Sequence, residues 1–434
     1  AAVSSISVSG ATYTLGITLT GIANGSETLT VTLVANSIYD VSGNVASTSQ
    51  SNNTVSLLDG RITTAYATAN HAGYNNRIIR IDSDTYLLAY KATTNSDGWL
   101  KTYTINSSGG FSTSAFLDHS STIYFQDLLQ IDSDTYILAY NGDDATTGSG
   151  QHIKTFKVKV DGSSIVQIGD LVHDTNSGSD DYSDLVRIDH NTYALAYHGY
   201  DGGGDNSWGG YIKTFTVNGG SITQIAKLRH FTSTTSYHSF IKVDADTYAL
   251  AFTDNSSDGN IRTFTIPADG SSITQAGTLE HDTDLGRYNS FVQVDDDTYA
   301  LSYQGTGSDG FIKTFTIAAD GATITQVAVL EHDGEYSIDN SLLKIDVNTF
   351  LLAYGGDGDD GYIKTFTISG DGSSVTQVAS LEHDEGHGIH NSLVQIDHDT
   401  YALAYWANYA PVFKTFTTPT VATATVPRIS SVVL

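Results

Sequence analysis

The hydrophobic residues of this chain recur in one pattern: an aromatic residue, three mostly small or aliphatic residues, and a second aromatic residue. Tyr299-Ala-Leu-Ser-Tyr303 is one copy. Neighbouring copies start 50 to 57 residues apart, so the pattern indicates a structural repeat. Seven copies begin at Tyr86, Tyr136, Tyr193, Tyr248, Tyr299, Phe350 and Tyr401.

Each repeat predicts four short strands. In one unit, apolar and polar residues alternate over 273–279, 290–294, 299–304 and 311–317. The turn before the aromatic motif reads Asp-x-Asp/Asn-Thr, in which the first aspartate favours an Asx turn, and a second hairpin carries Asp-Gly. Each repeat is therefore expected to form one small antiparallel sheet.

Seven such sheets predict a seven-bladed β-propeller over residues 60–418, since radial packing buries both faces of every sheet. The order of strands predicts how the ring closes. Residues 62–68 match an outer strand and precede the first motif, while residues 412–417 follow the last motif without an outer strand after them. We expect these two segments to share the last blade and to bring the ends of the ring together.

Two further residue types recur once per repeat. A histidine ends each outer strand, and a structural hydrogen bond in every blade is the expected role. A basic residue recurs in each third strand and is expected to pair with nearby carboxylates. The histidines are His71, His119, His173, His230, His281, His332 and His383; the basic residues are Lys101, Lys154, Lys213, Arg262, Lys313, Lys364 and Lys414.

In its closure and its outer-strand histidines, the region resembles WD-repeat-type propellers, although it lacks the Trp-Asp dipeptide. It also lacks the Asp-box spacing of sialidase propellers. The resemblance therefore implies the fold and carries no catalytic residue over.

Residues 1–59 differ from the repeats. The segment Asn36 to Ser47 resembles the closing half of bacterial immunoglobulin-like repeats found in long surface proteins, which implies a partial β-sandwich. Four predicted strands are too few for such a domain. Residues 419–434 resemble its first strand and are expected to complete an immunoglobulin-like domain in the same chain or in a neighbouring subunit, or else to begin the next covalent repeat. The predicted assembly strand carries Arg428, Ile429, Val432, Val433 and Leu434.

The composition restricts the location and the binding partners that can be expected for this protein. The 434 residues include neither cysteine nor methionine, which excludes disulfides and thiol chemistry and predicts an extracellular or cell-surface location. With 48 acidic and 20 basic residues the net charge is −28, which disfavours nucleic acid binding. No apolar run is long enough to predict membrane insertion.

Few residues in the sequence suggest a ligand-binding or metal-binding site. Trp208 and Trp406 could stack on sugar rings, and Asp357, Asp359 and Asp360 could offer oxygens to calcium. The loop with His383, His387 and His390 is the only local cluster suited to a transition metal.

These observations predict a non-enzymatic extracellular surface or filament protein that serves adhesion or assembly. Head-to-tail self-association through donor-strand contacts, or tandem covalent repeats, would supply the partners. The alternative is a glycan-binding, lectin-like propeller module of a large adhesin. A propeller hydrolase or lyase is a third option, which only the loop around His383 supports.

Overall fold

The computed structural model describes residues 2–9, 12–18, 28–30, 54–56, 62–69, 73–93, 95–106, 110–175, 182–200, 208–397, 399–407 and 410–418. Contacts divide the chain into two units, residues 1–62 with 418–434 and residues 63–417. No helix in the described ranges has the length and apolar character needed to cross a membrane.

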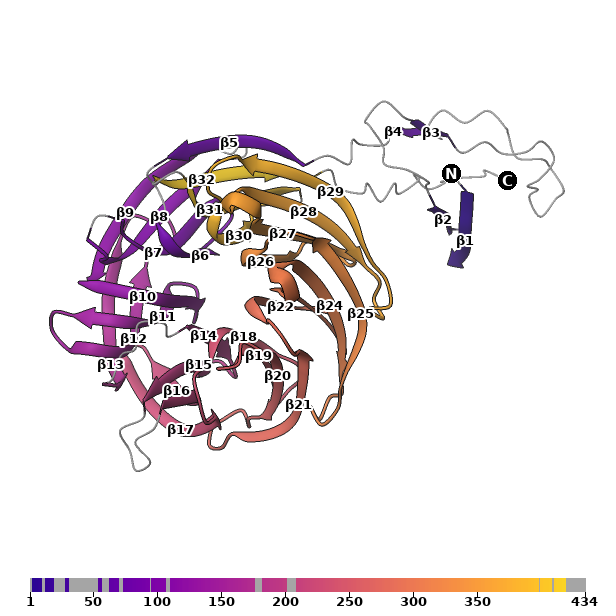
Figure 1. Cartoon of the computed structure of the whole chain (residues 1–434). Helices are drawn as coiled ribbons and strands as arrows, with labels where there is room; N and C mark the ends of the chain where they lie inside the picture. The colour runs from indigo at the N-terminus through magenta and orange to yellow at the C-terminus, as the bar shows by residue number, and fades with distance from the viewer. Residues whose placement is uncertain are drawn as a thin grey trace, which may run out of the picture. The chain divides into compact units, whose positions relative to one another are not determined.

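The second unit is a seven-bladed β-propeller, which confirms the predicted fold (Figure 1). Each blade is a four-stranded antiparallel sheet whose strands follow one another in space, and the first strand of each blade borders the central channel. The first three blades comprise β6 (Tyr74–Arg80), β7 (Thr85–Lys91), β8 (Gly98–Ile105) and β9 (Phe111–Ser120); β10 (Thr122–Gln130), β11 (Thr135–Asp144), β12 (Gly148–Val158) and β13 (Ile165–Asp174); and β14 (Ser183–Arg187), β15 (Thr192–Tyr200), β16 (Trp208–Asn218) and β17 (Ser221–Phe231).

The next three blades follow the same order. They comprise β18 (Ser236–Lys242), β19 (Thr247–Thr253), β20 (Gly259–Thr265) and β21 (Thr274–Asp282); β22 (Arg287–Asp295), β23 (Thr298–Gln304), β24 (Gly310–Ile317) and β25 (Ile324–Asp333); and β26 (Ile338–Lys344), β27 (Thr349–Gly355), β28 (Gly361–Ile368) and β29 (Val375–Asp384). Two short 3-10 helices, η1 (Thr306–Ser308) and η2 (Asp357–Asp359), lie in the loops before β24 and β28.

The last blade joins the two ends of the ring, as the sequence predicts. It contains β30 (Ile389–Gln395), β31 (Thr400–Ala407) and β32 (Ala410–Thr417), and its outer strand is β5 (Thr63–Ala69). Strand β5 pairs antiparallel with β32, with Ala69 opposite Val412. The hydrogen bonds of this ladder close the ring.

The aromatic motifs form the core because each lies on the second strand of a blade, between two neighbouring sheets. Tyr299, Leu301 and Tyr303 of β23 pack on one side against the small residues Ala249 and Ala251 of the preceding blade. Ala300 faces the other side and joins the cluster of the following blade. Large residues therefore oppose small ones across these interfaces, as close packing of neighbouring sheets requires.

The predicted turns are present. Asp82 Oδ1 accepts hydrogen bonds from the backbone N–H of Asp84 at 3.1 Å and of Thr85 at 2.9 Å, which is an Asx turn. In the Asp-Gly hairpins, Gly270 has a φ of +67°, where a side chain would be strained. These acids are turn residues of the scaffold.

Basic residues of the third strands tie neighbouring blades together. Lys364 Nζ donates to the carbonyl oxygen of His332 in the preceding blade at 2.5 Å and lies 3.4 Å from Asp333 Oδ2. The hydroxyl of Tyr354 donates to the same carboxylate at 2.6 Å. The predicted pairing of these cations with carboxylates is confirmed for Lys154, Lys313, Lys364 and Lys414. The same link to a histidine carbonyl oxygen joins Lys154 to His119, Lys213 to His173, Arg262 to His230, Lys313 to His281 and Lys414 to His383.

The histidine rings behave differently from the expectation. The backbone carbonyl makes the hydrogen bond, while both ring nitrogens lack a partner among the described residues in His119, His173, His230, His281, His332 and His383. Each ring instead packs edge-on against an aromatic side chain; His332 and Tyr354 have centroids 5.0 Å apart. The histidines are therefore packing residues.

The described parts of the other unit are two strand pairs. Strand β1 (Ala2–Ser9) pairs antiparallel with β2 (Thr12–Thr18), and β3 (Thr28–Thr30) pairs with β4 (Thr54–Ser56). These pairs do not establish an immunoglobulin-like sandwich, which stays a prediction. The predicted assembly strand, with Arg428 to Leu434, lies outside the described residues.

Candidate functional site

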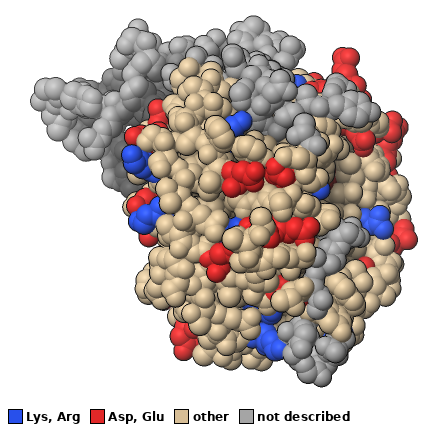
Figure 2. Space-filling view, turned by 90° about the vertical axis from the view of Figure 1, so that its left-hand side faces the viewer, with Lys and Arg blue, Asp and Glu red and all other residues tan. Residues whose placement is uncertain are grey.

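The mouth of the central channel holds a cavity of about 460 Å³. Residues at the start of the first strands of all seven blades line it, and Lys91 contributes a second cation beside Arg77. Acidic side chains also form patches on the outer surface (Figure 2). The cavity is the place where side chains from every blade converge.

The first strand of each blade carries three consecutive residues that we call the first, second and third channel positions. The first and second positions line the cavity, and of the third positions only Arg77 does. The first positions are Asn75, Phe125, Tyr182, Tyr237, Tyr288, Asp339 and His390. Five of them have a left-handed backbone: Asn75 (φ 51°), Tyr237 (51°), Tyr288 (53°), Asp339 (52°) and His390 (56°). This conformation is uncommon outside glycine, and it occurs where the strand registers shift.

The second positions hold the first ones in place. Asn289 Nδ2 donates to the carbonyl oxygen of Tyr237 at 3.0 Å, and Asn340 Nδ2 donates to that of Tyr288 at 3.1 Å. Each link crosses from one blade to the preceding one. Equivalent contacts join Gln126 to Asn75, His238 to Tyr182, and Asn76 to His390.

The third positions form a ring of hydrogen bonds between blades. Ser341 Oγ accepts from the N–H of Leu393 in the next blade at 3.1 Å. Ser239, Ser290 and Ser392 accept in the same way from Phe291, Leu342 and Ile78. In three consecutive blades Arg77, Asp127 and Asp184 take the place of the serine, so ionisable side chains replace hydroxyl groups in this part of the ring.

We expect Ser341→Ala to destabilise the propeller by about 1 to 3 kcal/mol, because the buried N–H of Leu393 loses its acceptor. Urea unfolding at neutral pH would measure this. Ser256→Ala, at an exposed loop residue, should leave the midpoint unchanged. Equal midpoints for both variants would show that the ring contributes no stability.

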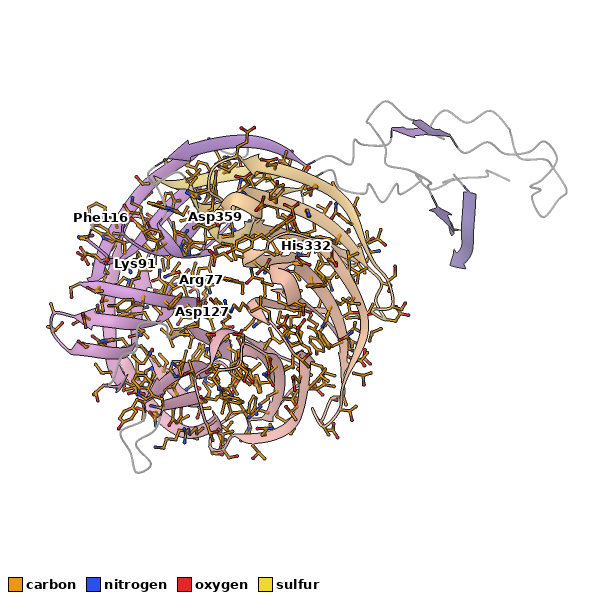
Figure 3. All side chains as sticks on the ribbon, in the orientation of Figure 1. Arg77, Lys91, Phe116, Asp127, His332 and Asp359 are labelled. Carbon is orange, nitrogen blue, oxygen red and sulfur yellow. The ribbon has the colours of Figure 1, made fainter. Side chains whose placement is uncertain are left out.

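Arg77, Asp127 and Asp184 form a charged cluster on the channel wall. Arg77 Nε lies 3.3 Å from Asp127 Oδ1, and the two side chains are neighbours at the inner edge of the ring (Figure 3). The N–H of Leu185 donates to Asp127 Oδ2 at 2.8 Å, and that of Phe240 donates to Asp184 Oδ2 at 2.5 Å. Burial and the neighbouring Asp127 carboxylate raise the pKa of Asp184 well above its usual value.

Across the mouth, Asp339 and His390 form a second pair. Asp339 Oδ2 accepts from the backbone N–H of His390 at 2.7 Å and lies 3.4 Å from His390 Nδ1. The imidazole also packs edge-on against Tyr74, with centroids 5.2 Å apart. A carboxylate and an aromatic ring therefore fix the orientation of this imidazole at the cavity.

The two tryptophans that the sequence suggests as ligand-binding residues lie in different blades. Trp406 lies in β31, is 5% exposed and packs against Tyr74 at 4.4 Å, whereas Trp208 begins β16, is 42% exposed and stacks on His198 at 5.3 Å. Both belong to strands, and neither is among the described residues that line the cavity. Their predicted role in ligand binding stays untested.

Of the candidate residues in the acidic loop and the histidine loop, only His390 lines the cavity. Asp357 and Asp359 belong to η2, which Asp360 follows, and Asp359 Oδ2 lies 3.5 Å from His387 Nδ1. His383 is buried between blades, and of the three predicted histidines only His390 reaches the cavity. Within the described ranges, no group of three or more His, Cys, Asp or Glu residues could hold a metal ion, and calcium binding stays a prediction.

Comparison with known proteins supports the fold. No model of a protein family matches this chain, and no curated protein matches it. A protein proposed to be a 6-phosphogluconolactonase from Bacteroides fragilis NCTC 9343 matches with a TM-score of 0.54 at 12% identity, over 75% of this chain and 88% of that one. The periplasmic gluconolactonase of Pseudomonas aeruginosa matches with a TM-score of 0.51 at 11% identity, over 80% of this chain and 92% of that one.

At these identities the likeness establishes the propeller fold. The predicted function, a non-enzymatic surface or filament protein with a glycan-binding module as its alternative, is wrong, since two solved propellers similar to this one are named as lactonases. The prediction that the chain is not an enzyme finds no confirmation.

Proposed function

We propose that this propeller hydrolyses a small, polyhydroxylated cyclic ester in the cavity at the channel mouth. The observation that carries the proposal is the Asp339–His390 pair, an imidazole oriented by a carboxylate at the wall of a cavity. The lactonase names of the similar propellers support the same reaction class.

His390 is suited to act as general base. Because its Nδ1 faces Asp339 Oδ2, the neutral ring carries its proton on Nδ1 and presents the lone pair of Nε2. An imidazole held in this way can take a proton from a water molecule as that water attacks an ester carbonyl. Asp339 acts by positioning the ring, as carboxylates do in other hydrolase sites.

Asp184 follows Ser183, which lines the cavity, and is not itself among the described lining residues; we assign it the role of general acid. Burial and Asp127 raise its pKa, which favours its protonated form. Arg77 and the N–H of Leu185 hold Asp127 beside it. A protonated carboxyl group can then give its proton to the departing ring oxygen, which would otherwise leave as an alkoxide.

The reaction balances with water as the only co-substrate. The water oxygen bonds to the carbonyl carbon, His390 takes the water proton, the bond from that carbon to the ring oxygen breaks, and Asp184 protonates this oxygen. The product is an open-chain hydroxy acid. Transfer of a proton from His390 to Asp184 through water restores both groups.

Polar atoms in the cavity wall favour a substrate with several hydroxyl groups. Gln126 Oε1, Ser183 Oγ, Asn289 Oδ1 and Asn391 Oδ1 are buried and lack a hydrogen-bond partner among the described residues, and all four residues line the cavity. Such atoms are satisfied by water or by a ligand. The volume of about 460 Å³ suits one sugar-sized ring.

A turnover assay tests the proposal. The purified chain would be mixed with glucono-1,5-lactone and related aldonolactones, acid release would be followed with a pH indicator, and spontaneous hydrolysis would be subtracted. We expect saturable turnover that falls by about 10²- to 10⁴-fold in His390→Gln and in Asp184→Asn.

Asp246→Asn is the matched control, because Asp246 is an exposed carboxylate in a turn. It should retain full activity, and circular dichroism would verify that all three variants fold. Wild-type rates equal to the spontaneous rate for every lactone, or unchanged rates in both active-site variants, would refute the proposal.

A further inference from the structure

The first blade places two cations at the cavity. Arg77 in β6 and Lys91 at the end of β7 are the only lysine or arginine side chains among the described residues that line it. The two strands pair antiparallel, with Arg77 opposite Ala89 and Tyr74 opposite Lys91. Both cations therefore belong to the part of the cavity wall that the first blade supplies (Figure 3).

Neither cation belongs to the repeat. No other blade has a lysine or arginine at the position of Arg77 or of Lys91, although all seven blades form the same sheet, so the scaffold does not require these two charges. The residues at the position of Arg77 are Asp127, Asp184, Ser239, Ser290, Ser341 and Ser392; those at the position of Lys91 are Asn141, His198, Thr253, Gln304, Gly355 and Trp406.

The charge of Lys91 has no partner of opposite sign within the described part of the chain. Its side chain is half-buried, and its ammonium group lies over the ring of Tyr124, 5.0 Å from the centroid, with no carboxylate paired to it. Burial lowers the pKa of Lys91, and no carboxylate opposes this shift. Arg77 differs, because Asp127 Oδ1 lies 3.3 Å from its Nε. The first blade thus contributes one uncompensated positive charge to the cavity.

Arg77 still has hydrogen-bond donors to offer. Its Nε faces Asp127, and its Nη1 donates to the carbonyl oxygen of Asn76 at 3.1 Å. Its Nη2 makes no hydrogen bond to the residues that the structure describes, and the side chain is 42% exposed. A ligand in the cavity can therefore meet an ammonium group and guanidinium N–H groups on the same blade.

We propose that Lys91 and Arg77 form a subsite for one carboxylate group of the substrate, so that the preferred substrate is a lactone of a sugar dicarboxylic acid. The inference rests on the proposed function and names its substrate class. Tyr74, which pairs with Lys91 across the strands, packs against the imidazole of His390 at 5.2 Å. The subsite therefore adjoins the general base, and a substrate of one ring can place its ester at His390 and its carboxylate at Lys91.

A carboxylate fits the charge of this subsite better than a phosphate ester does. One uncompensated ammonium group balances one negative charge, whereas a phosphate monoester carries about −1.5 to −2 at neutral pH. Asp339 lines the same cavity and would repel the additional charge. The planar carboxylate also matches the geometry of guanidinium donors.

The test uses three lactones that differ only at the last carbon of the chain. Glucaro-1,4-lactone has a carboxylate there, glucono-1,4-lactone a hydroxymethyl group, and the 6-phosphate of glucono-1,4-lactone a phosphate. Turnover would be measured for wild type, Lys91→Met and Lys91→Arg, and calorimetry would compare the binding of glucarate and gluconate. Lys159→Met is the matched control, because it removes the same charge at an exposed residue that does not line the cavity.

We expect kcat/KM of wild type to be about 10- to 100-fold higher for glucaro-1,4-lactone than for either other lactone, as one charge-assisted contact would give. The difference should lie in KM, because the carboxylate is bound equally in the ground state and in the transition state. Lys91→Met should lose the preference, whereas Lys91→Arg and Lys159→Met should keep most of it.

The outcomes separate this inference from the proposed function. Lactone turnover without a preference for the carboxylate, with a preference for the phosphate, or with a preference that Lys91→Met retains would overturn the subsite alone. Absence of turnover, together with glucarate binding that exceeds gluconate binding and is lost in Lys91→Met, would overturn the proposed function and support the subsite. Neither turnover nor selective binding of glucarate would overturn both.

Discussion

Lowering the pH from 7 to 5 should unfold the propeller. Six histidines are buried between blades, and burial depresses their pKa: to about 3 in His119, His281, His332 and His383, and well below the usual value in His173 and His230. Below a pH of about 6.5 the unfolded chain binds protons at these side chains and the folded chain does not, so stability falls with pH.

The direction and size of this change in stability follow from the linkage between proton binding and folding. The contribution of each histidine to stability is complete above its unfolded pKa of about 6.5 and is lost as the pH falls toward its folded pKa, at roughly 1.4 kcal/mol per pH unit. At pH 5 this amounts to about 2 kcal/mol for each of the four histidines whose pKa lies near 3, or about 8 kcal/mol together, which is comparable with the whole stability of a typical domain. His173 and His230 act in the same direction. Urea midpoints at pH 7.5, 6.5 and 5.5 would measure it, and equal midpoints would contradict it.

The substitution His332→Phe tests how much one buried histidine contributes to the pH dependence of stability. His332→Phe keeps an aromatic ring between Gly310 and Tyr354 and removes nitrogens that have no hydrogen-bond partner in the described chain. We expect this variant to lose less stability between pH 7 and pH 5, by about 2 kcal/mol. His190→Phe, at an exposed residue, should show the wild-type dependence.

Lys154→Met should destabilise the propeller by about 3 kcal/mol or more, because breaking a buried ion pair leaves its partner unpaired. The side chain of Lys154 is 1% exposed, and its Nζ lies 2.6 Å from Asp144 Oδ2 and donates to the carbonyl oxygen of His119. Burial opposes ionisation of Asp144, but the hydrogen bonds from Lys154 and Thr146 lower the pKa of Asp144 below its usual value. Removing the ammonium group removes the main compensation.

Lys157 provides the matched control, three residues further along β12. Its Nζ lies 2.7 Å from Asp134 Oδ2, but the two side chains are 52% and 41% exposed. Exposed pairs of this kind contribute about 0 to 1 kcal/mol, so Lys157→Met should have little effect on chemical unfolding. Equal losses in the two variants would show that burial does not decide the strength of these pairs.

The scaffold could be predicted from the sequence because its signals are local and repeated. The aromatic motif marks the second strand of every blade, and the unmatched segments 62–68 and 412–417 locate the closing strand. The histidines recurred just as clearly, but their position in sequence could not show that the backbone carbonyl, and not the ring, makes the hydrogen bond.

The cavity was missed because its residues are not repeated. Seven different blades each supply one first-position side chain, and only the folded ring brings Tyr237 and His390 to the same mouth. One signal was present in the sequence. Where other repeats have Asn-Ser or His-Ser before an apolar pair, three repeats have Arg77, Asp127 and Asp184 in place of the serine. In a repeat protein, such departures from the pattern mark residues with a separate role.

The chemistry was misassigned for a related reason. The loop with His383, His387 and His390 was predicted as one cluster, yet the ends of neighbouring strands separate its members, and His390 pairs with Asp339, 51 residues away. Proximity in sequence therefore grouped histidines that do not share a site. The partner of His390 comes from the preceding blade, where a local motif cannot reveal it.

A structure of the protein bound to a cyclic phosphonate, a stable analogue of the attacked lactone, would test the central claim most directly. The account predicts the probe in the cavity at the channel mouth, with its phosphonate group beside His390 and its ring oxygen toward Asp184. A probe bound elsewhere, such as in the hollow lined by Arg187 and Lys242 beside the turn after β14, would contradict it.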